Sequence, residues 1–286
     1  MPSLIDIRRR IRSVKNTQQI TKAMKMVSAA KLRRAQDRVI AARPYAGLLR
    51  QMLSNVAAAV AGDERVAANA LLAVRPERNV MLVLVTADKG LAGAFNTNLI
   101  KGSLHFAAER PEATVAYLLV GRKGRDFHRK RGSRTAGEQI GLTAKPGYTD
   151  AAALAVQAME QFRREEIDAV YLLFNEFKSV VSQRLTVARV LPIEMPAEAG
   201  TADYIYEQPP VAMLDALLPR YVETEFYRAL LESAAAEQAA RMTAMDAASS
   251  NAADMIDKLT LYMNRVRQAS ITKEIIEVVS GAAAAE

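Results

Sequence analysis

The sequence predicts an α/β protein in which N- and C-terminal helices form a long antiparallel coiled coil, with a Rossmann-like α/β domain inserted between them. Three observations lead to this fold class. Apolar residues at alternating three- and four-residue spacing run through the start of the chain, the same spacing returns near its end, and short apolar strands alternate with helical segments between. A narrow seam of this period packs against one partner helix. Alternating strands and helices form a mostly parallel sheet.

The expected boundaries divide the chain into five segments. These are an N-terminal coiled-coil helix at 1–60, a linker at 61–77, the α/β domain at 78–193, a second linker at 194–209 and a C-terminal coiled-coil helix at 210–286. Both linkers are rich in Ala, Glu and Pro, which distinguishes them from the periodic segments on either side.

The first helix is expected to carry its seam in two registers separated by a stutter. The seam residues are Leu4, Ile7, Ile11 and Val14, then Ile20, Met24 and Val27 after a phase shift, and then Leu32, Ala35, Val39, Ala42, Ala46, Leu49, Leu53, Val56 and Val60. A phase shift of this kind is typical of a stutter in a coiled coil. Pro44 should bend this helix or remove one of its hydrogen bonds.

The last helix should begin near Pro209 and Pro210, because proline is tolerated in the first turn of a helix. Its seam is expected at Met242, Met245, Ser249, Ala252, Ile256, Leu259, Met263 and Val266. Ser280 and Gly281 are expected to end the helix after about residue 279. Much of both seams is Ala or Ser, so the two helices can approach closely.

The middle of the chain predicts a sheet with helices on its faces. Buried strands are expected at 79–87, 113–120 and 169–174, an antiparallel edge strand at 180–190, and helices at 96–109, 121–131 and 150–165, the last with Thr149 or Asp150 as N-cap.

The net charge of +8 is concentrated at the N-terminus. The first 50 residues hold 13 Lys and Arg against two acids, a net charge of +11, so the rest of the chain carries −3. Nucleic acid, anionic lipid or an acidic protein surface could each bind such a basic arm. The chain has no cysteine, which excludes disulfides, thiol nucleophiles and Cys-based zinc sites. The longest apolar run is too short to cross a bilayer, so a soluble or peripheral protein is expected.

No motif in the sequence predicts catalysis, a cofactor or a metal site. Segment 86–96 joins a strand to a helix, where a doubly wound fold would hold a phosphate, but its glycines do not match G-x-G-x-x-G and we interpret it as a tight turn. The basic run at 121–131 is interpreted as a solvated face, with phosphate binding left open. His105 and His128, the only histidines, are expected at the surface or in packing.

Three segments resemble the signatures of the F-type ATP synthase gamma subunit family. They are ITKAMKMVSAAKLRRAQ at 20–36, ARMTAM at 240–245 and RQASITKEIIEVVSGAA at 267–283, and segment 86–96 is similar to the family's first strand and turn. The resemblance covers the whole chain in order.

This resemblance implies a central rotor stalk that catalyses nothing by itself. It would transmit torque between the membrane rotor ring, the c-ring, and the catalytic subunits of a proton-translocating ATP synthase. The implied partners are the alpha and beta subunits of the α3β3 ring, the epsilon subunit and the c-ring, and not nucleic acid. The implied location is the cytoplasmic side of the bacterial plasma (inner) membrane, as a peripheral subunit.

The resemblance also assigns partner-binding residues position by position. Arg267 and Gln268 match a pair that contacts a loop of a catalytic subunit, and Met24 lies where shaft and catalytic subunits couple. Lys31, Arg33 and Arg34 would face an acidic loop of the catalytic subunits. Tyr204, Tyr206 and Glu207 would lie near the epsilon subunit and the rotor ring.

Two other classes of protein remain open from the residues alone. The first is a basic coiled-coil adaptor that binds nucleic acid or anionic membrane, since phosphate contacts come mainly from Lys and Arg. The second is a small nucleotide-binding enzyme built on the middle domain.

Overall fold

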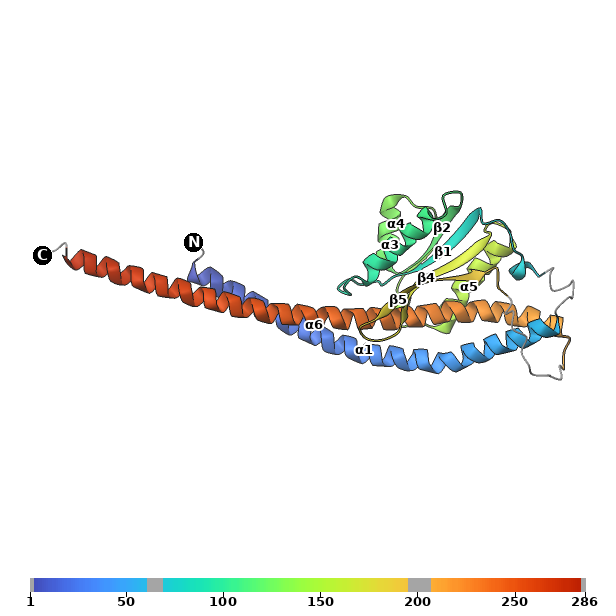
Figure 1. Ribbon diagram of the computed structural model, residues 1–286, viewed down its shortest axis with the longest axis horizontal. Coiled ribbons are helices and arrows are strands. Elements are labelled where there is room, and N and C mark those ends of the chain that lie inside the picture. Colours follow the sequence, from blue (N-terminus) through green and yellow to red (C-terminus); the bar gives the residue numbers. More distant parts are fainter. Residues whose placement is uncertain (1–2, 61–68, 195–206, 284–286) are drawn as a thin grey trace. The chain divides into compact units, whose positions relative to one another are not determined.

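The computed structural model describes residues 3–60, 69–194 and 207–283. It contains two compact units. One, the helical unit, comprises Met1–Ser28 and Met242–Glu286; the other, the mixed unit, comprises Ala29–Arg241. Helix α1 (Leu4–Ala59) and helix α6 (Pro210–Ala283) each contribute residues to both units (Figure 1).

Helix α1 carries one uninterrupted seam instead of the predicted two registers. Thr21 and Ser28 are buried, whereas Ile20 and Val27 are 60% and 55% exposed. The predicted phase shift is therefore wrong, because polar residues fill the seam where apolar ones were expected. Met24, Gln36 and Asn55 are also half-buried or buried. One series of buried and half-buried positions keeps the three- and four-residue alternation along the whole helix: Leu4, Ile7, Ile11, Val14, Gln18, Thr21, Lys25, Ser28, Leu32, Ala35, Val39, Ala42, Ala46, Leu49, Leu53, Val56 and Val60.

Helix α6 begins at Pro210, as expected, and all eight of its predicted seam residues are buried or half-buried. It continues to Ala283, beyond the predicted stop at Ser280 and Gly281. A glycine inside a helix costs only about 1 kcal/mol relative to alanine, and the alanines that follow favour helix. Pro44 in α1 and Pro219 in α6 also lie within continuous helices.

The inserted sheet has five strands in the order β3-β2-β1-β4-β5. They are β1 (Asn79–Val85), β2 (Thr114–Val120), β3 (Thr135–Gln139), β4 (Ala169–Phe177) and β5 (Gln183–Leu191). The first four are parallel, and β5 pairs antiparallel with β4, which confirms the predicted edge strand. Strand β3 was not predicted, because its sequence TAGEQ is polar and mostly exposed at the other edge.

Three α-helices connect the strands. They are α3 (Phe95–Ala108), α4 (Arg122–Arg131) and α5 (Tyr148–Arg163), and two short 3-10 turns, η1 (Ala70–Leu72) and η2 (Leu142–Ala144), accompany them. The N-cap of α5 is Gly147, which corrects the prediction of Thr149 or Asp150. Asp150 still serves this helix start, because its carboxylate accepts the Gly147 N–H at 3.3 Å.

The sheet is covered on both faces within the mixed unit (Figure 1). One continuous core joins Met81, Val83 and Val85 of β1 to α5, to the first turns of α6 and to the end of α1, where Leu53 is 1% exposed. Helices α3 and α4 cover the opposite face. The first third of α6 thus packs into the core of the α/β domain, and in the same unit it also packs against helix α1.

Candidate functional site

The carboxyl edge of the parallel strands is filled by the chain's own side chains. Asp88, just after β1, accepts hydrogen bonds from the backbone N–H of Arg122 at 3.0 Å, from the N–H of Gly141 at 3.0 Å and from the hydroxyl of Thr143 at 3.2 Å. Arg122 begins α4, and a helix N-terminus is where this kind of fold offers its amide groups to a phosphate. The carboxylate of Asp88 therefore occupies that anion position itself.

Segment 86–96 forms a turn, as the sequence indicated. The side-chain oxygen of Asn96 accepts the Ala87 N–H at 2.9 Å, and Leu91 adopts a left-handed φ of 60°. Thr86 is buried beneath the turn, where its hydroxyl accepts the Gly124 N–H at 2.8 Å. Gly121 is needed here, since a Cβ at its φ of 92° would lie 2.0 Å from the Thr86 carbonyl oxygen. Within the segment, Gly93 adopts a left-handed φ of 54°, a turn conformation that favours glycine.

The two histidines have the ordinary roles expected of them. His128 is buried, its ring nitrogens lie 3.0 Å and 3.1 Å from the hydroxyls of Ser103 and Ser133, and its ring lies against Tyr117. Burial, helped by the charge of Arg131, lowers the pKa of His128 to about 4, so the imidazole is neutral at physiological pH. His105 lies at the surface, and the basic side chains of α4 around His128 are mostly exposed.

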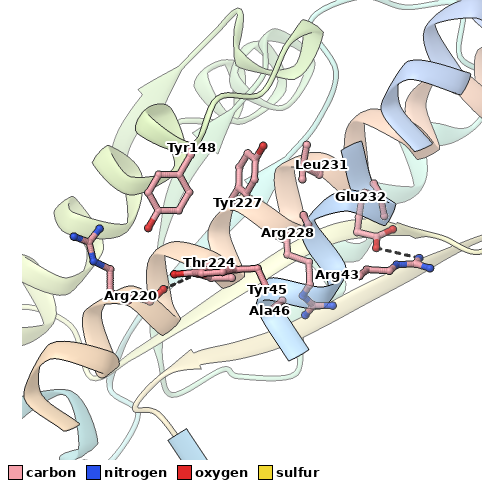
Figure 2. Close-up of a pocket in the computed structure, with 12 residues that line it drawn as sticks. Arg43, Tyr45, Ala46, Tyr148, Arg220, Thr224, Tyr227, Arg228, Leu231 and Glu232 are labelled. Atoms are coloured by element: carbon pink, nitrogen blue, oxygen red, sulfur yellow. Dashed lines mark hydrogen bonds and ion pairs between the residues drawn. The ribbon is translucent and has the colours of Figure 1, made fainter. Parts of the chain in front are cut away.

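Four buried glutamates mark where α6 meets α1 and the sheet. They are Glu223, Glu225, Glu232 and Glu237. The carboxylate of Glu232 accepts the backbone N–H of Phe177, at the end of β4, at 3.0 Å and pairs with Arg43 of α1 at 3.5 Å (Figure 2). Glu225 likewise pairs with Arg50 of α1 at 3.3 Å. The two carboxylates are buried whereas Arg43 and Arg50 are mostly exposed, so these contacts link α6 to α1 and, through Glu232, to β4.

The next turns of α6 are tied to the end of β1. Glu237 and Arg241 form a largely buried ion pair at 2.7 Å, and Arg241 also donates to the carbonyl of Gly90 at 3.3 Å. Burial raises the pKa of Glu237, and the charge of Arg241 opposes that rise. The hydroxyl of Ser233 donates to the carbonyl of Val85 at 3.4 Å. Helix α6 is therefore bonded to two neighbouring strands of the sheet.

A cleft of about 380 Å³ lies between α1, α6 and the start of α5 (Figure 2). The seam positions Ala42 and Ala46 of α1 line it, together with Tyr227 of α6. Tyr148 packs edge-on against Tyr227 at 5.7 Å and donates its hydroxyl to Glu223 at 2.6 Å. The cleft is lined mainly by apolar surface, and its arginines are engaged with glutamates of α6.

In the helical unit, the two helices meet through polar groups. The hydroxyls of Thr21 and Ser249 lie 2.7 Å apart, Gln18 donates to the Ser249 carbonyl at 3.3 Å, and Lys25 pairs with Asp246 at 2.6 Å. Small polar partners on both helices explain why the seam of α1 turns away from Ile20 and Val27. Those apolar side chains are left on the outer surface.

The residues predicted to bind partners lie mostly on exposed surfaces. Arg267 and Gln268 are exposed and Met24 is half-buried in the helical unit; Lys31, Arg33, Arg34 and Glu207 are exposed in the mixed unit. Tyr204 and Tyr206 lie outside the described residues. The mixed unit also brings Arg38 and Lys145 beside Lys31 and Arg34 at one hollow, which excludes Arg33. Sequence reasoning missed Lys145, because only the fold places it near α1.

Comparison with known proteins identifies the family. A family model described as ATP synthase matches residues 3–285. The ATP synthase gamma chain of Solibacter usitatus is 73% identical over 286 residues, covering 100% of both chains. This chain belongs to the ATP synthase gamma-chain family. The gamma chain of Anaeromyxobacter sp. strain Fw109-5 is 50% identical over 289 residues, covering 99% of both chains.

Solved structures agree with this assignment. A chain from the central stalk and c-ring of the Tetrahymena thermophila mitochondrial ATP synthase has a TM-score of 0.63 and 27% identity, covering 80% of this chain and 99% of that one. A chain from the rotor of the Euglena gracilis enzyme shares the fold, with a TM-score of 0.63 at 17% identity over 94% of this chain and 98% of that one. The gamma chain is the central-stalk subunit of the rotor and a non-catalytic subunit of the complex.

Within the described residues of this gamma chain, no helix has both the length and the apolarity needed to span a membrane. The same residues contain no group of three or more histidines and carboxylates placed to hold a metal ion.

Proposed function

We propose that this gamma chain transmits torque between a membrane c-ring and the catalytic subunits of a proton-translocating ATP synthase. The observation that supports this most directly is helix α6. It is bonded through Glu232 and Arg241 to the inserted sheet, and it continues as one helix to Arg267 and beyond. An element that carries torque needs such continuity between the part that is driven and the part that drives.

The proposed partners are the alpha and beta subunits of an α3β3 ring, the epsilon subunit and the c-ring. A chain from the Euglena gracilis mitochondrial enzyme, described with F1 and the c-ring, has a TM-score of 0.67 to this one at 18% identity, a likeness of fold. The gamma chains of highest identity named above are bacterial. We therefore place the chain, as a peripheral subunit, on the cytoplasmic side of a bacterial inner membrane.

The exposed residues divide the proposed contacts among these partners. Arg267 and Gln268 would contact a loop of a catalytic subunit. Met24 would lie where the shaft couples to the catalytic subunits. Lys31, Arg33 and Arg34 would face acidic groups of the same ring. Glu207, together with Tyr204 and Tyr206, would face the epsilon subunit and the c-ring. A rotating shaft can shift catalytic subunits between states only through contacts that differ among those states.

Reconstitution tests this proposal. The full chain is added to a matching α3β3 ring, and ATPase activity and rotation of a bead attached to the gamma chain are recorded. We expect the double variant Arg267→Ala/Gln268→Ala to lower rotation-coupled ATPase severalfold, because each residue supplies polar contacts to the ring. Lys258→Ala, an exposed cation of α6 in the same unit, is the matched control and should leave the rate unchanged.

Two results would contradict the proposal. One is a gamma chain that neither co-purifies with the ring nor supports rotation. The other is a loss of rotation in the Lys258→Ala control as large as in the double variant, since the proposed contacts would then have no specific place on α6.

A further inference from the structure

A basic hollow lies in the mixed unit between α1, α6 and the turn that leads into α5. Its volume is about 430 Å³, within the range of small-molecule sites. Four cations line it, and its lining contains no carboxylate: Lys31, Arg34 and Arg38 come from α1, and Lys145 comes from the turn before α5. Leu231, Ala234 and Ala35 supply an apolar floor.

The three cations of α1 share one helical face. Their spacing of three and four residues brings Lys31, Arg34 and Arg38 together, and like charges at this spacing destabilise a helix. Arg33, one residue away from Arg34, points about 100° around the helix and does not line the hollow. The fold then adds Lys145 from a segment more than a hundred residues away, which concentrates positive charge further.

These cations lack counter-charges of their own. None of Lys31, Arg34, Arg38 and Lys145 forms an ion pair with a carboxylate in the part of the chain that the structure describes. Lys31 acts electrostatically on Glu237, but that carboxylate is buried and already paired with Arg241 at 2.7 Å. Asp88, which accepts a hydrogen bond from Thr143 of the lining, already accepts three hydrogen bonds within the chain. Among the described residues of the chain itself, no ion pair with a carboxylate neutralises the cations of the hollow.

We propose that this hollow binds a small polyvalent phosphate anion, such as pyrophosphate or the polyphosphate group of a nucleotide. Phosphate oxygens accept the charge-assisted hydrogen bonds that guanidinium and ammonium groups donate. A hollow of about 430 Å³ fits such an anion better than an extended peptide. A bound anion would contact α1, α6 and the turn before α5 at the same time, so it would link these three elements of the mixed unit.

Titration calorimetry of the purified full chain with pyrophosphate tests this site. We expect saturable binding below millimolar concentration. Arg34→Gln, Arg38→Gln and Lys145→Gln should each weaken it by about tenfold, because each removes a charge-assisted bond. Arg33→Gln is the matched control, with the same change of charge on the same helix, and should change affinity by less than about twofold. Pyrophosphate should also raise the melting temperature of the wild type but not of the Arg38→Gln chain.

Parallel titrations distinguish the sources of the anion. If ATP competes with pyrophosphate, and the same three variants lose ATP binding, the site is supported and a nucleotide is identified as an occupant. Binding of a hexaglutamate peptide without binding of pyrophosphate would overturn the proposal in favour of an acidic protein segment. Equal weakening by Arg33→Gln and Arg34→Gln would overturn it as diffuse attraction.

Absence of saturable binding at millimolar pyrophosphate would also overturn the proposal. That failure is separable from the rotor role, because a chain that still drives rotation on the α3β3 ring would lack the anion site and keep its proposed function. Circular dichroism of the exposed-residue variants confirms that each is folded.

Discussion

Individual side chains decide what the inserted domain can bind. Asp88 places a carboxylate at the start of α4, where related folds hold a phosphate, and Thr86 takes a further amide beneath it. The sequence indicated a turn that contains glycines, but not which groups form hydrogen bonds with its backbone. The buried His128 is a similar case. Its hydroxyl partners are Ser103 of α3 and Ser133, which lies two residues after the end of α4.

His128 should make the stability of the inserted domain sensitive to acid. Its pKa is about 4 when folded, against an ordinary value of 6.5, so the unfolded chain binds a proton first as pH falls. Stability should therefore fall between pH 6.5 and about 4, by at most about 1.4 kcal/mol per pH unit. Urea unfolding of the wild type and of His128→Gln at several pH values measures this. The advantage of the wild type should shrink as pH falls; parallel curves would contradict the argument.

The helices show how partner chemistry sets a register. The stutter was predicted from the positions of Ile20, Met24 and Val27, because apolar side chains usually fill a seam. Thr21 and Ser28 fill it instead, since hydrogen bonds to Ser249 and its neighbours satisfy small polar groups at close approach. One sequence alone shows which residues could form a seam, but the facing helix decides between two registers one residue apart.

A matched pair of leucines on α1 tests the seam where it enters the core of the mixed unit. Leu53 is 1% exposed and Leu48 is 60% exposed. We expect Leu53→Ala to lower the free energy of unfolding by about 2–5 kcal/mol, because it leaves a cavity in the core. Leu48→Ala should change it by less than about 0.5 kcal/mol. Chemical denaturation monitored by circular dichroism compares the two variants, and equal costs would mean that the seam lies elsewhere.

At the scale of the molecule, α6 belongs to two structures at once. Its first turns complete the core of the α/β domain, and its buried glutamates pair with α1 and with the strand ends. This double membership is what supports a role in torque transmission for a chain with no catalytic group of its own. The basic N-terminal arm left an adaptor for nucleic acid or membrane open, and membership of the gamma-chain family favours the shaft.

Glu232 should be the most sensitive point of this junction. Glu232→Ala leaves the Phe177 N–H without its acceptor, and we expect a loss of about 1–3 kcal/mol in the free energy of unfolding. Glu232→Gln keeps an acceptor and should lose less, because only the pair with the exposed Arg43 is removed. Glu160→Ala, at an exposed pair, serves as control. If alanine and glutamine cost the same, the hydrogen bond to β4 does not hold the junction.

The residues alone were enough to predict the class of most segments: the two long helices, the buried strands expected at 79–87, 113–120 and 169–174, the antiparallel edge and the family. These follow from local periodicity and from motifs, which are properties of neighbouring residues. Four features became visible only in the folded chain: the register of α1, the polar edge strand β3, the burial of the α6 glutamates, and the position of Lys145 beside Arg34 and Arg38. Each of these depends on which distant group satisfies a charge or a hydrogen bond, and chain spacing does not encode that choice.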